Sequence, residues 1–182
     1  MDVKETGLDG LKVLTPRVFG DARGYFMESF NTRTFMESVG EDPGFVQDNE
    51  SKSSRGVLRG LHYQIQNPQG KLVRAVHGEI FDVAVDVRRS SPTFGQWYGT
   101  TLSSENKRQL WVPIGFAHGF LTLSETAVVA YKASDYYCAE GERSIIWNDP
   151  DIAIEWPDIN ANPELSEKDQ AAVRFNAVET FA

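Results

Sequence analysis

VLRGLHYQIQNPQGKLVRAVHGEIFDVAVDVRR, residues 57–89, contains three short apolar segments that are separated by turn residues. In the last segment, the even positions from Ile80 to Asp86 include two aspartates, whereas the odd positions from Phe81 to Val87 are all apolar. This alternation has the period of a β-strand, because successive side chains of a strand point to opposite faces. We therefore expect a strand whose apolar face points into the core.

The same kind of pattern continues through most of the chain. Between Gly44 and Trp147, further short apolar segments alternate with turns; they are FVQDNES, QWYGTTLS, QLWVPIG, HGFLTLS, AVVAYKASDYY and SIIW. Strands that recur at a spacing of about 8 to 12 residues are typical of β-sandwiches and small barrels. The sequence therefore predicts a mainly β protein. At 182 residues, we expect it to form a single domain, residues 1–182.

Helix signals are few. Asn31 is a suitable N-cap for the segment TRTFMESVG, and Gly40 at its end is a typical helix stop. Near the C-terminus, NPELSEKDQAAV places Ser166 three residues before Asp169, which is the spacing of a capping box. We expect one short helix at each of these places.

Basic residues are concentrated around the first half of the opening stretch. No acidic residue lies between Glu50 and Glu79, although this interval holds five lysines and arginines and two of the three histidines. In a chain with a formal net charge of -8, such a cluster indicates a local site for an anion. The pI near 4.9 argues against nucleic acid or an anionic membrane as a partner, since both favour a broad positive surface.

Other features predict a cytoplasmic protein that does not enter a membrane. Cys138 is the only cysteine, so no internal disulfide can form. The N-terminal segment MDVKETGLDG has no apolar core of the kind that a secretory signal needs. No apolar run approaches the roughly 20 residues that a membrane span requires.

The chain has three histidines, His62, His77 and His118. Three imidazoles can hold a catalytic metal, and metal-binding cupin barrels place two ligands in a His-x-His pair and a third after a Pro-x-Gly turn. The later half of this pattern is present in PIGFAHG, residues 113–119, but the first half reads HYQ at 62–64 and is followed by Lys71. Tyrosine, glutamine and an ammonium group are poor substitutes for metal ligands. We therefore expect no metal, and we interpret His77 as a surface or structural residue.

Without a metal, His62 is a candidate proton acceptor, because a neutral imidazole is basic near neutral pH. A satisfied core histidine is the alternative. Arg59 lies three residues away on the same expected strand, so the two side chains point to opposite faces unless Gly60 bends the strand. Whether Arg59 and His62 share a site stays open at this point.

Lys71 and Tyr131 are further candidates. Lys71 heads a strand whose alternate positions are Val73 and Ala75, so it either projects inward or is a solvated lysine at a strand end. A buried lysine is costly unless it meets an anion or a developing oxyanion. Tyr131 is two positions after Val129, so its side chain is expected on the same face of the strand; it is either a core tyrosine or a proton donor.

Together these segments resemble the dTDP-4-dehydrorhamnose 3,5-epimerase family over nearly the whole chain. The resemblance is carried by FGDARGYFMESFN, FVQDNESKS, VLRGLHYQ, QGKLVRAVHGEIFDVAVDVR, SPTFGQW, NKRQLWVPIGFAHGF, YKASDYY, IIWNDP and ELSEKD. It implies a cupin-type β-barrel (jelly roll) with a short helix in the N-terminal half and short C-terminal helices. It also implies a homodimer to which the N-terminal segment contributes, and a C-terminal helical segment that closes the site.

The resemblance further implies epimerisation at C3 and C5 of dTDP-4-dehydro-6-deoxy-D-glucose, without metal or nicotinamide, in dTDP-L-rhamnose biosynthesis. In the family the histidine of RGLH is the base, which matches His62, and an aspartate near ELSEKD orients it, which matches Asp169. The lysine of QGK, Lys71 here, stabilises the oxyanion, and the tyrosine of the YK pair, Tyr131 here, donates a proton from the far face.

The resemblance also implies a substrate-binding set. Arg59 and Lys168 face the diphosphate or its neighbourhood, whereas Arg23 and Glu28 contact the thymidine from the neighbouring subunit. The rest of the set is Gln47, Asn49, His118, Tyr136 and Glu142, with Tyr137 as the alternative to Tyr136 for stacking near the base. Some relatives with the same fold invert only one carbon, and others move the ketone but usually lack the combination of His62, Lys71 and Tyr131. A single-centre epimerase on a related dTDP-4-keto sugar is therefore the alternative function.

Overall fold

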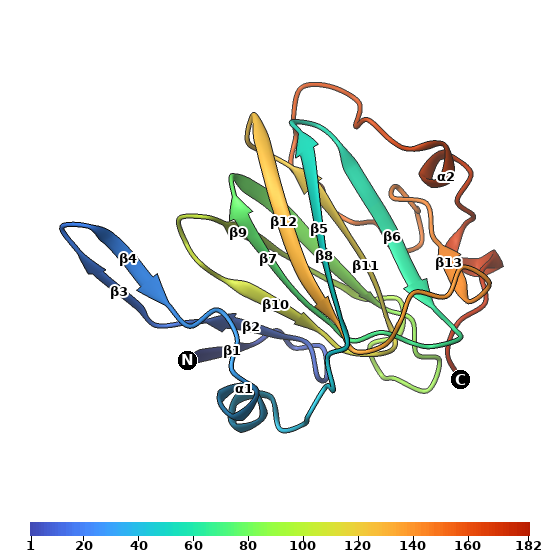
Figure 1. Ribbon diagram of the computed structural model, residues 1–182. Helices are drawn as coiled ribbons and strands as arrows, with labels where there is room; N and C mark the ends of the chain where they lie inside the picture. The colour runs from blue at the N-terminus through green and yellow to red at the C-terminus, as the bar shows by residue number, and fades with distance from the viewer.

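The computed structural model describes residues 1–182 as two β-sheets, a hairpin and three short helical segments (Figure 1). One sheet has six strands, which in spatial order are β1 (Asp2–Glu5), β2 (Lys12–Thr15), β10 (Gln109–Val112), β7 (Lys71–His77), β12 (Thr126–Ala133) and β5 (Gln47–Ser54). The pairs of neighbouring strands in it are antiparallel.

The second sheet has five strands, in the order β13 (Glu142–Ser144), β6 (Leu58–Gln64), β11 (Phe116–Thr122), β8 (Glu79–Asp86) and β9 (Trp97–Ser103). The strands β3 (Val18–Asp21) and β4 (Gly24–Met27) form a separate hairpin, which projects away from both sheets in Figure 1. The helical segments are α1 (Thr32–Val39), α2 (Glu167–Gln170) and the 3-10 turn η1 (Phe175–Ala177).

The two sheets pack face to face over the main core. Val73 and Val129 of the six-stranded sheet and Ile80 and Phe120 of the five-stranded sheet belong to the same buried cluster. No strand pairing joins one sheet to the other, so the fold is a two-sheet jelly roll of the cupin kind. The prediction of a mainly β, cupin-type fold with few short helices is confirmed.

The expectation for β8 is wrong about which face points to the main core. Ile80 and Ala84, on the face that carries the aspartates, lie in the cluster between the sheets. The apolar face, represented by Val83 and Val85, packs instead in a second cluster with residues of the C-terminal segment such as Val178. Both faces of β8 are therefore buried, because the C-terminal segment, residues 145–181, covers the outer side of the five-stranded sheet.

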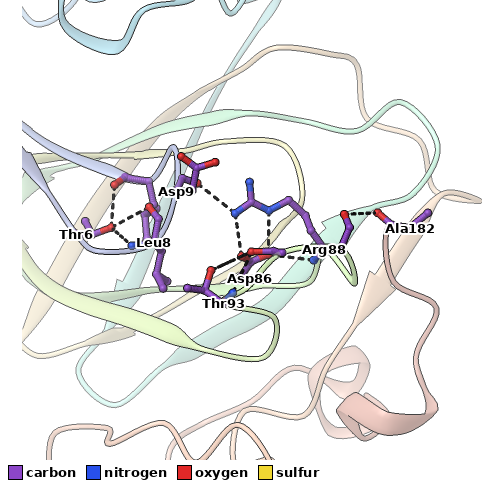
Figure 2. A network of polar contacts seen from close by, with 10 residues as sticks. Thr6, Leu8, Asp9, Asp86, Arg88, Thr93 and Ala182 are labelled. Atoms are coloured by element: carbon purple, nitrogen blue, oxygen red, sulfur yellow. Dashed lines mark hydrogen bonds and ion pairs between the residues drawn. The ribbon is translucent and has the colours of Figure 1, made fainter.

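The aspartates of β8 are fully buried and therefore need partners. Figure 2 shows how Asp86 is satisfied: Arg88 donates from Nε at 2.9 Å and from Nη2 at 2.8 Å, and Thr93 Oγ1 donates at 2.7 Å. Ser91 Oγ donates as well, at 2.6 Å. Burial raises the pKa of Asp86, but these hydrogen bonds outweigh it and hold the pKa below its usual value. Arg88 also reaches the carbonyl of Asp9, so the network ties the N-terminal segment to β8.

The helix signals in the sequence are confirmed. The Asn31 side chain accepts the Thr34 N–H at 3.2 Å at the start of α1, and Gly40 ends the helix in a left-handed conformation with a φ of 96°. Phe35 anchors α1 in a third buried cluster with Trp111. None of the helices has both the length and the apolar character that are needed to cross a membrane.

Candidate active site

A cavity of about 290 Å³ lies where strands of both sheets meet the C-terminal helix α2. It is lined by Ser51, Arg59, His62, Lys71, His118, Gly119, Phe120, Tyr131, Ser166, Lys168 and Asp169. All four residues that the resemblance implies to be catalytic are in this set, although they come from three distant parts of the chain. The cavity is therefore the candidate active site.

His62 and Asp169 form an acid–imidazole pair in the cavity. The two residues are 107 positions apart in sequence, and His62 Nε2 lies 2.5 Å from Asp169 Oδ1. The Asp169 side chain is buried, whereas about a quarter of the His62 side chain, 26%, is exposed. Because Asp169 holds Nε2, the other ring nitrogen, Nδ1, is the one that can accept a proton from a ligand. This geometry suits a general base with an orienting carboxylate.

Asp169 is also part of the cap of α2. Its backbone N–H donates to Ser166 Oγ at 3.1 Å, and Ser166 Oγ donates to Asp169 Oδ2 at 2.8 Å. Asp169 therefore makes the capping contact with Ser166 and the contact with His62 at the same time. Burial raises the pKa of Asp169, but the hydrogen bonds from His62 and Ser166 outweigh it and keep the pKa below its usual value.

Gly60 resolves the question of whether Arg59 and His62 share a site. On β11, His118 is the partner of His62 and Phe120 is the partner of Arg59, so three steps on β6 match two steps on β11. Gly60 lies within this bulge with a φ of 114°, a conformation that favours glycine. The extra residue turns Arg59 and His62 toward the same cavity.

Lys71 projects inward at the start of β7. Its strand neighbours Val73 and Ala75 are buried in the main core, which confirms the inward parity that the sequence allowed. Burial lowers the pKa of Lys71 from 10.5 to about 8, although the negative charges of Glu142 and Asp82 partly oppose this effect. An ammonium group in such a place can stabilise an oxyanion strongly, because little water screens it.

Tyr131 reaches the cavity from β12. Its strand neighbour Val129 is buried in the main core, and the Tyr131 ring packs against the same cluster. Burial raises the pKa of the Tyr131 phenol, and the charge of Glu142 raises it further. Tyr131 therefore keeps its proton at neutral pH and can act as a proton donor.

His118 is the register partner of His62, so the two imidazoles stand on adjacent strands. His118 Nε2 lies 2.9 Å from Asp82 Oδ1, and both residues are buried. The second oxygen of Asp82, Oδ2, is buried without a hydrogen-bond partner. Asp82 was not among the residues singled out from the sequence. An acidic side chain in the middle of the otherwise apolar segment IFDVAV of β8 is the signal that could have found it.

Lys168 and Glu142 form an ion pair at the rim of the cavity. Tyr137 Oη donates to Glu142 Oε2 at 2.9 Å and thereby connects the loop after β12 to this pair. Burial raises the pKa of Glu142, but the hydrogen bonds from Lys168 and Tyr137 outweigh it and keep the pKa below its usual value.

Six residues of the implied binding set do not line this cavity: Glu142, which pairs with Lys168 at its rim, and Gln47, Asn49, Tyr136, Arg23 and Glu28. Gln47 and Asn49 are side by side on β5, where Gln47 Nε2 donates to Asn49 Oδ1 at 2.9 Å. Tyr136 is 62% exposed on the loop that follows β12. Arg23 is at the tip of the projecting hairpin, where it pairs with Asp21.

Glu28 directly follows that hairpin and borders a separate hollow beside α1. Within one copy of the chain, Arg23 and Glu28 are therefore not brought to the catalytic residues.

The three histidines do not converge. His62 and His118 are neighbours, but His77 is at the far end of β7 and is exposed. No group of three or more histidine, cysteine, aspartate and glutamate side chains is close enough to hold a metal ion. Among the residues missed in the sequence, Ser51 and Phe120 complete the wall of the cavity, and no local pattern distinguishes them from ordinary strand residues.

Comparisons with known proteins identify the family of this chain. A family model described as dTDP-4-dehydrorhamnose 3,5-epimerase matches residues 5–177. A protein of that name from Pseudomonas aeruginosa is 61% identical over 166 residues, which is 91% of each chain.

Two solved structures are informative. The dTDP-6-deoxy-D-glucose-3,5-epimerase of Legionella pneumophila, in complex with dTDP-4-keto-L-rhamnose, is 53% identical, with a TM-score of 0.95 over 98% of this chain and 94% of that one. ChmJ, a 3'-monoepimerase from Streptomyces bikiniensis in complex with dTDP-quinovose, is 35% identical, with a TM-score of 0.88 over 93% and 86% of the two chains. The match over most of the sequence and the agreement in fold show that this chain belongs to the dTDP-4-dehydrorhamnose 3,5-epimerase family of isomerases.

Proposed function

We propose that this chain inverts C3 and C5 of dTDP-4-dehydro-6-deoxy-D-glucose by removing and returning protons beside the C4 ketone, in dTDP-L-rhamnose biosynthesis. The observation that carries the proposal is the cavity that unites the His62–Asp169 pair with Lys71 and Tyr131. The Legionella relative, which is bound to dTDP-4-keto-L-rhamnose, supports a double epimerisation. In this proposal the enzyme acts in the cytoplasm.

The first step is proton abstraction by His62. Nδ1 takes the proton from the carbon beside the ketone, and the electron pair of the broken C–H bond moves onto the C4 oxygen as an enolate. Asp169, at 2.5 Å from Nε2, orients the ring and stabilises the imidazolium that forms. Lys71, whose pKa of about 8 leaves it largely charged at neutral pH, stabilises the enolate oxygen.

The second step is proton return by Tyr131. His62 is on the five-stranded sheet and Tyr131 is on the six-stranded sheet, so the base and the acid occupy opposite walls of the cavity. A proton removed at one wall and delivered from the other inverts the carbon. The enolate electrons then form the new C–H bond. The phenolate and the imidazolium exchange protons with water before the second carbon reacts, and again before the next turnover.

The nucleotide half of the substrate accounts for the remaining basic residues. Arg59 is exposed and has only Ser53 and the Lys52 carbonyl as partners, so its guanidinium can turn to phosphate oxygens. Lys168, at the rim, can exchange Glu142 for the diphosphate. Gln47, Asn49, His118, Glu142 and Tyr136 are assigned to the remaining substrate contacts.

We also propose a homodimer that completes the nucleotide site. The hairpin β3–β4 projects from the sheets (Figure 1). It exposes large apolar side chains, since Phe19 is 52% exposed and Phe26 is 71% exposed. Exposed apolar groups of this size are expected to be covered by a partner. A second copy that accepts this hairpin would bring Arg23 and Glu28 to its own nucleotide site.

A single-centre epimerase is the second candidate, since the 3'-monoepimerase from Streptomyces bikiniensis has the same fold. Identifying the product separates the two. Purified enzyme is incubated with dTDP-4-dehydro-6-deoxy-D-glucose, and the product is identified by NMR. We expect dTDP-4-dehydro-L-rhamnose with the wild type and no product with His62→Gln. A product inverted at one carbon favours the second candidate. An unchanged substrate contradicts the proposal.

The expectation that the enzyme needs no metal has its own test. Metal analysis of the purified protein, and activity after dialysis against a chelator, are expected to show no stoichiometric metal and no loss of activity. A bound metal whose removal abolishes activity would favour a metal-dependent cupin enzyme instead.

A further inference from the structure

Ser166 makes two hydrogen bonds with one residue of the candidate active site. It stands directly before α2, and its Oγ both accepts the Asp169 N–H at 3.1 Å and donates to Asp169 Oδ2 at 2.8 Å. Ser166 also lines the cavity. A serine that only capped the helix would need the first bond but not the second.

The second bond gives each oxygen of the Asp169 carboxylate a different partner. Oδ2 is held by Ser166, and Oδ1 faces His62 Nε2 at 2.5 Å. Asp169 is buried, with 4% of its surface exposed, so each oxygen needs a partner and little water is available to replace one. The hydroxyl therefore fixes the rotation of the carboxylate about its own axis.

We propose that Ser166 is a positioning residue that fixes the Asp169 carboxylate and, through it, the orientation and tautomer of the His62 imidazole. This inference rests on the proposed function, in which His62 is the base. Ser166 itself touches neither the substrate nor the transferred proton in this scheme. It acts by keeping the Nε2–H group of His62 hydrogen-bonded to Asp169, so that Nδ1 of His62 faces the substrate.

The local structure explains why such an anchor is needed. The helix α2 has only four residues, and its backbone bonds are few; they include Gln170 N–H to Ser166 O at 3.0 Å and Ala171 N–H to Glu167 O at 3.1 Å. So short a helix does not hold a side chain rigidly by itself. The hydrogen bond from Ser166 is also one of the causes that lower the pKa of Asp169, which fits a bond to the charged carboxylate.

Three variants separate positioning from capping. Ser166→Thr keeps a hydroxyl that can make both bonds. Ser166→Ala removes both bonds, and Ser166→Gly removes the hydroxyl but remains an acceptable N-cap residue. We expect kcat to fall about tenfold in Ser166→Ala and Ser166→Gly with little change in KM, which is the size of one lost bond to a charged group. Ser166→Thr is expected to retain most of the wild-type kcat.

A second readout does not depend on turnover. In protein labelled with 15N histidine, the His62 ring signals are assigned by comparison with His62→Gln, and their chemical shifts report which nitrogen carries the proton. We expect Nε2–H to dominate in the wild type and in Ser166→Thr. We expect a mixture of tautomers, with faster exchange of the ring proton, in Ser166→Gly and Ser166→Ala.

The outcomes are distinguishable. A wild-type kcat and unchanged His62 signals in Ser166→Gly would overturn the positioning role, as would a Ser166→Thr variant as impaired as Ser166→Ala. Wild-type protein that leaves the sugar nucleotide unchanged would contradict the proposed function instead. In that case the NMR comparison still decides whether Ser166 orients the pair.

Discussion

Gly60 lies directly against Gly119, so closely that a Cβ atom on Gly60 would be 2.6 Å from the Cα atom of Gly119. This contact joins β6 to β11 at the bulge that separates Arg59 from His62. Neither position has room for a side chain, because a Cβ on Gly119 would in turn be 2.7 Å from the Arg59 carbonyl oxygen. The shape of the candidate active site therefore depends on two glycines that carry no chemistry.

The variant Gly119→Ala tests this dependence. The added methyl group has to push β6 and β11 apart, so we expect the free energy of unfolding to fall by about 1–3 kcal/mol. Because Arg59 and His62 move with the strand, kcat/KM is expected to fall more than tenfold. Urea unfolding and steady-state kinetics measure the two effects. Gly20→Ala is the matched control, because a Cβ atom on Gly20 would be 3.8 Å from its nearest neighbour, the Gly24 carbonyl oxygen. We expect this variant to leave the free energy of unfolding nearly unchanged.

Lys71→Met is expected to stabilise the protein while it removes activity. The pKa of Lys71 is about 8 in the folded chain and near 10.5 when unfolded, so the fold disfavours the charged amine. At pH 7 the lysine is charged in both states, and its replacement by a similar apolar side chain should raise the free energy of unfolding by about 1–3 kcal/mol.

The sign of the accompanying pH effect follows from the same shift. Between pH 8 and pH 10.5 the unfolded chain binds more protons at Lys71 than the folded chain, so the wild type gains stability as the pH rises through this window. The advantage of Lys71→Met in urea unfolding should therefore shrink between pH 7 and pH 10. Lys132→Met, which removes an outer-face lysine paired with Asp48, should show no such advantage. An equal advantage at both pH values would contradict this account.

The activity of the wild type should fall as the pH rises through about 8, because a neutral Lys71 amine stabilises an enolate less well. Tyr131 is not expected to cause this loss, since burial raises the pKa of its phenol. In Lys71→Arg the guanidinium stays charged, so the loss should move to a higher pH even if the maximum rate is lower. A profile that is flat from pH 7 to pH 9.5 in the wild type would refute the assignment of Lys71.

Arg88→Met is expected to reduce stability but not catalysis. It leaves Asp86, which is fully buried, without its charged partner, and this should cost about 3 kcal/mol in urea unfolding. None of the residues of this network lines the cavity, so the kcat of the folded variant should equal that of the wild type. Arg89→Met serves as a control, because the only hydrogen bond of the Arg89 side chain is an exposed one to Thr180, and its loss should lower the free energy of unfolding little.

Local patterns in the sequence predicted the elements that depend on local physics. Asn31 begins α1 and Gly40 ends it, as expected. Strand parity allowed an inward position for Lys71 and placed Tyr131 on the side of Val129, and both side chains line the cavity. The pairing of His62 with Asp169 could not be derived from spacing, since 107 residues separate them, and it was expected only from the resemblance to the family.

Two other features required the tertiary structure. Strand parity left open whether Arg59 and His62 share a site, since the answer depended on a bend at Gly60, and the bulge at Gly60 brings both to the cavity. The apolar face of β8 was expected to point to the main core, yet it packs under the C-terminal segment, and this leaves Asp82 between the sheets beside His118. Strand periodicity shows which side chains share a face, but not what covers that face.

Solvent exchange followed by NMR tests the central claim most directly. The wild-type enzyme is incubated with dTDP-4-dehydro-6-deoxy-D-glucose in deuterated water, and deuterium is followed at C3 and at C5. Abstraction by His62 and return by Tyr131 predict deuterium at both carbons with inversion, and no exchange with His62→Gln. In Tyr131→Phe, inversion should fall more than exchange at the first carbon, because His62 still removes the proton. Deuterium at one carbon alone would show a single-centre epimerase, and no exchange at either carbon would contradict the account.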